Sequence, residues 1–161
     1  MIRDNFFNIV EDYIEHDEFK KLKSINHHGI TRYDHSLRVA YYTYIVTRFL
    51  HLHYIDATRA AVLHDFFTDE VESEKSIFKL RRHPKYAVEN ASKYFELNEL
   101  EKDIISTHMF PVTFTPPKYL ESWIVDIVDD CCAIYEKGHC VRRELRAACM
   151  FLFILLINYL K

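Results

Sequence analysis

Glycine and proline are scarce in this sequence. The chain holds 2 glycines and 4 prolines among its 161 residues, whereas 49% of its residues are hydrophobic. Disordered and fibrous chains are rich in the two scarce residues, so both classes are excluded. The scarcity also favours helices, because glycine and proline are the residues that helices tolerate least. A chain of this length has room for one sizeable core, so we expect a single domain.

A strong charge excess and a cysteine framework are also missing. The net charge of −3 gives no general attraction to nucleic acid, and we expect no such partner. Acidic residues at positions 4, 11 and 12 interrupt the N-terminal stretch, so we expect no signal peptide and a cytoplasmic protein. The cysteines lack the spacing of a disulfide or zinc framework, and we expect them to be reduced: Cys131, Cys132, Cys140 and Cys149.

Apolar residues recur at helical spacing along most of the chain. Because strand-like alternation is missing, the sequence predicts an all-α fold of about seven helices. Asp56, His83 and Asn98 are predicted N-caps, the last in a capping box with Glu101, and Gly138 is predicted to separate the last two helices. The predicted helices cover about residues 2–22, 32–50, 57–64, 84–95, 99–108, 118–137 and 139–160.

Four of the 10 histidines stand at the ends of predicted helical stripes or helices. His35, His64 and His108 each end an apolar stripe, and His83 begins a helix. One such histidine is usually a core residue bonded to a backbone carbonyl. Four of them, with Asp65 directly after His64, predict instead a buried metal site rich in nitrogen ligands. That composition suits iron, manganese or zinc better than calcium or magnesium alone.

A further carboxylate ligand is expected from the helix at residues 118–137. On a helical wheel Asp126 points away from the predicted buried sector, whereas Asp129 and Asp130 border it on opposite sides. Periodicity alone does not choose between these two aspartates. The predicted buried sector consists of Ile124, Ile127, Val128, Cys131 and Ile134.

The order His35, then His64-Asp65, then Asp129 resembles the H, HD, D signature of the HD-domain phosphohydrolases. The segments 34–40 and 61–65 are similar to the contexts that this family places around its ligands. The resemblance covers roughly residues 28–137 and favours Asp129 over Asp130, because family members carry the last aspartate in an apolar-Asp-polar segment.

The resemblance implies a binuclear metal site. Asp65 would bridge two divalent ions, of which iron or manganese fit best and zinc, nickel, cobalt or magnesium are alternatives. A hydroxide between the ions would hydrolyse a phosphate ester or anhydride of a nucleotide or another small phosphorylated metabolite. One ion would be held by His35, His64 and Asp129, and the other by His83 and His108.

Several charged residues near these ligands are candidates for substrate contacts. Arg38, one helical turn after His35, is the first choice for a phosphate contact, since a guanidinium binds two phosphate oxygens at once. Lys79, Arg81 and Arg82 form a second basic cluster, in which Lys79 and Arg82 are the candidate substrate contacts, and Asp69 is a candidate general acid or base. A solvated or ion-paired surface role remains the alternative for each. The lysine that many family members carry after the HD pair is absent here.

The expected organisation is an HD core at residues 28–137 within one domain spanning residues 1–161. A scaffold helix in residues 1–27 precedes the core, and an apolar helix in residues 138–161 follows it. The uninterrupted apolar run Ala147–Ile157 falls short of the roughly 18 residues of a membrane span. We expect it in the core or at a homodimer interface, with peripheral membrane attachment as the lesser alternative.

Two other functions stay open beside hydrolysis. Some HD-fold proteins with a similar di-iron ligand set are oxygenases, and a non-catalytic module could keep the pocket to sense nucleotides. Metal-dependent phosphate release separates hydrolysis from both alternatives.

Overall fold

Helices make up most of the described part of the chain. The computed structural model describes residues 2–27, 29–67 and 77–159, and the side chains within 5–25, 29–67 and 81–139. Within these ranges the predicted all-α fold with seven α-helices is confirmed. The elements are α1 (Ile2–Ile14), α2 (Asp17–Lys20), the 3-10 helix η1 (Lys21–Ser24), β1 (Asn26–His27), β2 (Ile30–Thr31), α3 (Arg32–Phe49), α4 (Tyr54–Leu63), α5 (Ile77–Tyr94), α6 (Glu99–Thr107) and α7 (Leu120–Tyr159).

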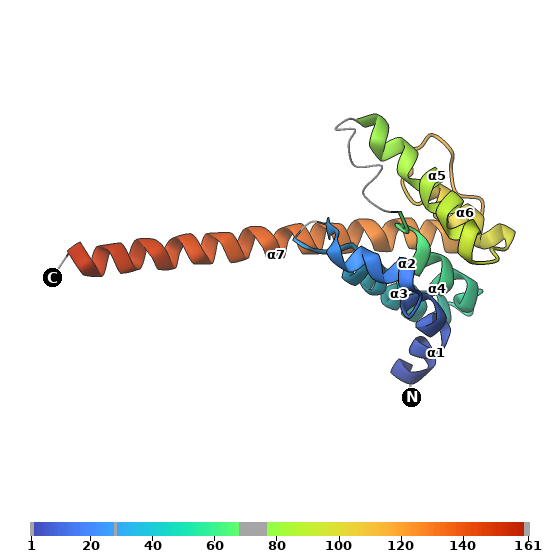
Figure 1. Cartoon of the computed structure of the whole chain (residues 1–161), viewed down its shortest axis with the longest axis horizontal. Coiled ribbons are helices and arrows are strands. Elements are labelled where there is room, and N and C mark those ends of the chain that lie inside the picture. The colour runs from blue at the N-terminus through green and yellow to red at the C-terminus, as the bar shows by residue number, and fades with distance from the viewer. Residues whose placement is uncertain (1, 28, 68–76, 160–161) are drawn as a thin grey trace.

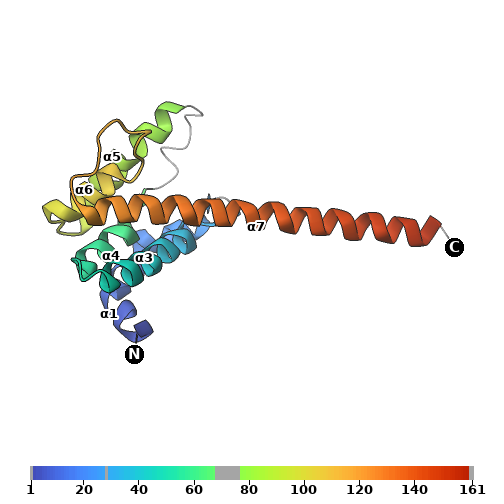
Figure 2. The same cartoon turned by 180° about the vertical axis from the view of Figure 1, so that it is seen from behind.

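The long helix α7 organises the molecule. Its first half passes between the pair α5 and α6 on one side and the helices α1, α3 and α4 on the other (Figures 1 and 2). Helices α3 and α4 pack against each other and against α7, while α6 contacts α4, α5 and α7. The core between α1, α3 and α4 buries Val10, Val39, Tyr44 and Leu63 completely. Helix ends from both sides therefore meet around α7.

The predicted helix at residues 2–22 is broken in the structure. Helix α1 ends at Ile14, and His16 caps α2 by accepting a hydrogen bond from the backbone N–H of Glu18 at 3.3 Å. A side chain that bonds to nearby backbone competes with helix continuation, which explains the break. After η1 the chain forms an antiparallel ribbon of two strands, β1 and β2, each two residues long. Gly29 lies between the strands and has a φ of 91°. The sequence predicts no strands and so misses this ribbon, because a strand of two residues is too short to show alternating polar and apolar residues.

Two predicted helix starts are also wrong. Helix α5 begins at Ile77 and contains Pro84, so His83 lies within the helix and is not its N-cap. The segment before the proline contains no helix breaker, and the helix tolerates the one hydrogen bond that proline removes. Helix α4 begins at Tyr54, so Asp56 lies in its first turn and accepts a hydrogen bond from Asn98. The predicted capping box of Asn98 with Glu101 is confirmed.

Helix α7 runs through Gly138 without a break, so the predicted division into two helices is wrong. A glycine inside a helix costs only about 1 kcal/mol relative to alanine, which the neighbouring turns offset. The predicted buried sector of this helix is wrong too, because Ile127, Cys131 and Ile134 are exposed. Its buried residues are instead mostly polar: Glu121, Ser122, Val125, Asp126, Asp129, Cys132 and Glu136.

Beyond residue 139 the helix leaves the rest of the domain and extends away from it (Figures 1 and 2). The backbone of the apolar run Ala147–Ile157 lies in this extending part of α7, and its side chains are outside those described. Within the described ranges, none of the helices combines the length and the hydropathy that crossing a bilayer requires.

Candidate metal centre

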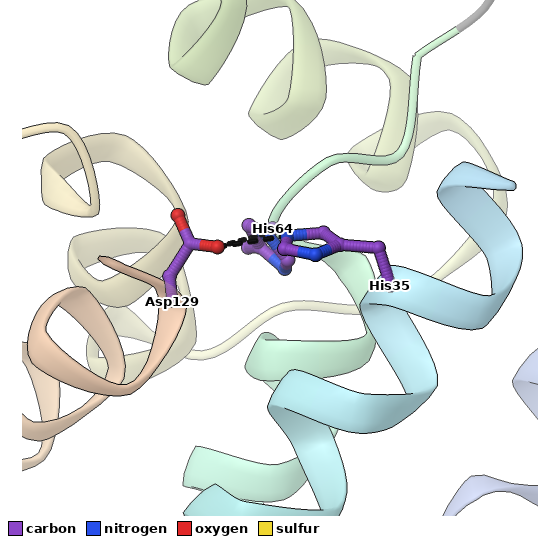
Figure 3. Close-up of side chains that lie close together, drawn as sticks. All are labelled: His35, His64 and Asp129. Carbon is purple, nitrogen blue, oxygen red and sulfur yellow. Dashed lines mark hydrogen bonds and ion pairs between the residues drawn. The ribbon is translucent and has the colours of Figure 1, made fainter. Parts of the chain in front are cut away.

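Six side chains that the sequence singled out come together in the structure. His35 comes from α3, His64 and Asp65 directly follow α4, and Asp129 comes from α7 (Figure 3). The other two are His83 from α5 and His108 at the end of α6, so five helices contribute to one buried cluster. All six side chains are buried, with His64 completely inaccessible.

One half of the cluster surrounds Asp129. Its Oδ1 atom lies 2.8 Å from His35 Nε2 and 3.5 Å from His64 Nε2. The Oδ2 atom of Asp65 lies 4.0 Å from the same nitrogen of His64. His35, His64 and Asp129 thus offer ligand atoms close enough to hold one metal ion.

The other half surrounds the second oxygen of Asp65. Its Oδ1 atom lies 3.5 Å from His83 Nε2 and 3.7 Å from His108 Nε2, and these two nitrogens are 2.9 Å apart. The group His64, Asp65 and His108 also meets the spacing of a metal site. Asp65 therefore directs one oxygen toward His64 and the other toward His83 and His108, as a bridging carboxylate would.

Hydrogen bonds fix the orientation of the histidine rings. Nδ1 of His64 faces the carbonyl of Ala61 at 2.8 Å, and Nδ1 of His108 faces the carbonyl of Ile105 at 2.8 Å. A carbonyl only accepts, so both Nδ1 atoms carry the proton. When each ring is neutral, its Nε2 atom is a lone pair directed into the cluster.

The donor set fits a divalent metal ion. Within the described side chains, the Nε2 atom of His64 is buried without a hydrogen-bond partner. A buried polar atom without a partner is costly, and a bound metal ion would give this nitrogen a partner. Nitrogen ligands with two carboxylates suit iron, manganese or zinc.

The electrostatics of the cluster divide in the same way as its geometry. Burial lowers the pKa of His35, but hydrogen bonds to Asp129 and Glu136 outweigh burial and raise this pKa to about 10. Burial raises the pKa of Asp129, yet the neighbouring His64 and His35 bring it well below its usual value. Burial and the neighbouring His83 lower the pKa of His108 to about 3, so its imidazole stays neutral. Neutral imidazole is the form that binds a metal.

Glu136 is the main residue that the sequence prediction missed. Its carboxylate is 3% exposed, and it accepts hydrogen bonds from His35 Nδ1 at 2.9 Å and from Arg38 at 2.6 Å. It thereby fixes the tautomer of His35, leaving Nε2 directed at Asp129. The signal was its position seven residues after Asp129, two turns along the same helix face. Arg38, predicted to contact phosphate, is thus ion-paired to Glu136, with 32% of its side chain exposed.

Arg32 also belongs to the surroundings of the cluster and was not predicted. It is 4% exposed, its Nε lies 3.9 Å from Asp65 Oδ2, and it donates a hydrogen bond to the carbonyl of Phe67 at 2.8 Å. Its guanidinium also stacks over the ring of Phe67 at 4.0 Å. A fixed positive charge beside Asp65 favours the ionised carboxylate.

The remaining predicted residues lie apart from the cluster or outside the described part of the chain. Asp69 falls in the undescribed residues 68–76, and Lys79 belongs to α5 but its side chain is not among those described. Arg82 is exposed on the same helix. Asp130 is exposed as well, whereas Asp126 is buried, contrary to its predicted outward direction. Burial and the charges of Asp130 and Asp129 raise the pKa of Asp126 to about 7.

Fold and site together define an all-helical protein with a buried histidine–aspartate cluster that could hold a metal ion. The model of the HD domain family matches residues 32–134, which is more than half of the chain. The chain therefore belongs to the HD domain family, whose members are generally metal-dependent hydrolases. No curated protein and no solved structure matches this chain.

Proposed function

We propose that this protein is a metal-dependent phosphohydrolase that holds two divalent ions and cleaves a phosphate ester or anhydride. The observation that carries the proposal is the position of Asp65, whose Oδ2 faces His64 at 4.0 Å while its Oδ1 faces His83 and His108 at 3.5 and 3.7 Å. Iron or manganese fits the nitrogen-rich donor set best. The proposed substrate is a nucleotide or another small phosphorylated metabolite.

Each half of the cluster would hold one ion. His35, His64 and Asp129 would bind the first and His83 and His108 the second, with Asp65 between them. A pair of divalent ions supplies a nucleophile at neutral pH and neutralises charge on the phosphoryl group. The protein's own contribution is a preset geometry, because the carbonyls of Ala61 and Ile105 and the carboxylate of Glu136 hold three rings in place.

Arg38 would connect the metal centre with the substrate. One nitrogen of its guanidinium is engaged by Glu136, which itself holds His35. A guanidinium has five N–H donors in a rigid fork, so the same group can also bind a phosphate oxygen. Arg82 and Lys79 are proposed as further phosphate contacts, and Asp69 as a general acid or base.

Phosphate release from a substrate panel tests the proposal. The full chain is assayed with manganese against a chromogenic phosphomonoester, nucleoside mono-, di- and triphosphates and dinucleoside polyphosphates. We expect release from at least one substrate, its loss with a chelator and its return with added manganese. The variant Asp130→Asn should keep full activity, because Asp130 is exposed and is not one of the proposed metal ligands. Bound metal without turnover on any substrate would refute the proposal, and oxygen consumption by an iron-loaded sample would favour the oxygenase alternative.

A further inference from the structure

An apolar groove lies between α3 and α7 on the surface of the domain. It has a volume of about 390 Å³, and its lining includes Tyr42 and Val46 from α3 and Ile127, Val128 and Tyr135 from α7. Ile127 and Tyr135 are each 57% exposed. Contiguous apolar surface of this kind is rare on a soluble monomer and marks an interaction site.

Apolar residues continue around the groove. Phe49 at the end of α3 is 80% exposed, Ile134 on α7 is 71% exposed, and Trp123 is 38% exposed. The face of α7 that carries Ile127, Cys131 and Ile134 is the one that its sequence predicts as buried. The hydrophobic pattern of α7 thus fits a face that is covered, while the domain leaves it uncovered.

The sequence of the same helix contains a second apolar stretch. The run Ala147–Ile157 lies in the half of α7 that extends away from the other helices (Figures 1 and 2). Because α7 is one continuous helix, the run cannot fold back onto the groove of its own chain. It can reach the groove of a second copy.

We propose that two copies of this chain pair through antiparallel α7 helices, each placing its run Ala147–Ile157 on the α3–α7 groove of the other. The α7 side of the groove is centred at about residue 131, and the run is centred at about residue 152. At 1.5 Å per residue, these two centres are about 30 Å apart along the helix. An antiparallel pair with its two-fold axis at about residue 141 buries both surfaces of both copies at once. A two-fold axis makes one contact twice, which closes the assembly as a dimer.

Gly138 supports this register. It lies inside α7, where glycine costs about 1 kcal/mol relative to alanine. A methyl group at this position would meet nothing within 4 Å in the described part of its own chain, so internal packing gives no reason for the glycine. The residue lies within one turn of the proposed axis, where the missing side chain lets two helices approach closely. The dimer proposal does not require the proposed hydrolase function, although Arg38, the proposed phosphate contact, also lines the groove.

The mass of the full chain in solution tests the proposal. Sedimentation equilibrium of the reduced protein should give about twice the 19.4 kDa of one chain. Ile127→Glu should weaken the dimer at least about tenfold, because it places a charge in the centre of the contact. The matched control is Phe114→Glu, which changes an apolar residue that is 77% exposed beside α5, on the other side of α7. The control should leave the dimer intact.

Cross-linking tests the direction of the two helices. With a short bis-maleimide, the antiparallel register should join Cys131 of one copy to Cys149 of the other, since these residues lie nearly opposite each other about residue 141. A parallel pair would instead join Cys131 to Cys131 and Cys149 to Cys149. A monomer at all concentrations, a dimer insensitive to Ile127→Glu, or parallel cross-links would each overturn the proposal. So would a monomer that co-sediments with phosphatidylserine vesicles, because the run would then be a membrane anchor.

Discussion

Replacing Asp65 with asparagine is expected to lower kcat/KM for phosphate release by on the order of 10³-fold. The carboxylate supplies two ligand oxygens and a negative charge to both halves of the cluster, within 3.5 to 4.0 Å of three histidine nitrogens. Asparagine keeps the size of the side chain but has one oxygen and no charge. Steady-state kinetics with manganese measure the loss, and circular dichroism verifies that the variant is folded.

The control for this substitution is Asp130→Asn, since Asp130 is exposed beside the buried Asp129. Its kcat/KM should stay within about twofold of the wild-type value, because exposed surface substitutions away from a site have small effects. If Asp65→Asn kept more than a tenth of wild-type activity, Asp65 would not bridge a catalytic metal pair.

Replacing Glu136 with glutamine is expected to weaken manganese binding by about 10- to 100-fold. The carboxylate orients His35 through Nδ1 at 2.9 Å and is itself paired with Arg38 at 2.6 Å. Glutamine can still accept one hydrogen bond, but it lacks the charge that makes the imidazole of His35 a stronger ligand. Calorimetric titration of the metal-free protein with manganese measures the dissociation constant without relying on activity.

Glu121→Gln is a matched control on the same helix. Glu121 is a buried carboxylate of α7 that accepts a hydrogen bond from a histidine, His53, in a pair that includes none of the six clustered side chains. Equal manganese affinities for Glu136→Gln and the wild type would show that Glu136 does not position a ligand. Equal losses in Glu136→Gln and Glu121→Gln would assign the effect to the stability of α7 instead.

The sequence predicted the cluster better than it predicted the helices that build it. His35, His64 and His108 end apolar stripes, and a polar residue in such a place signals a buried polar site whatever the bounds of the helix. Helix bounds depend on local capping, which the pattern predicted wrongly at two places. His16 caps a new helix inside the predicted helix at residues 2–22, and Pro84 lies inside α5 rather than at its start. The predicted resemblance to the HD family is confirmed.

Helix α7 shows why periodicity failed on one face. The rule that apolar residues lie inside assigned Ile127 and Ile134 to the core, yet the side of α7 that meets the domain carries Asp129 and Glu136. A metal centre requires polar side chains in the interior, so the helix that completes it presents its polar face inward. Pattern analysis of one chain cannot see this inversion. The spacing of seven residues places Glu136 on the face of Asp129, but only the structure shows that it contacts a histidine 101 positions away in the sequence.

The metal content of the full chain tests the central claim most directly. Protein purified without a chelator is dialysed against manganese, and bound metal is measured by inductively coupled plasma mass spectrometry for the wild type, His64→Ala and Asp130→Asn. We expect about two ions per chain in the wild type and in Asp130→Asn. We expect fewer than one in His64→Ala, because Nε2 of the wild-type His64 faces both Asp65 and Asp129. No bound metal in the wild type, or equal metal in His64→Ala, would contradict the central claim.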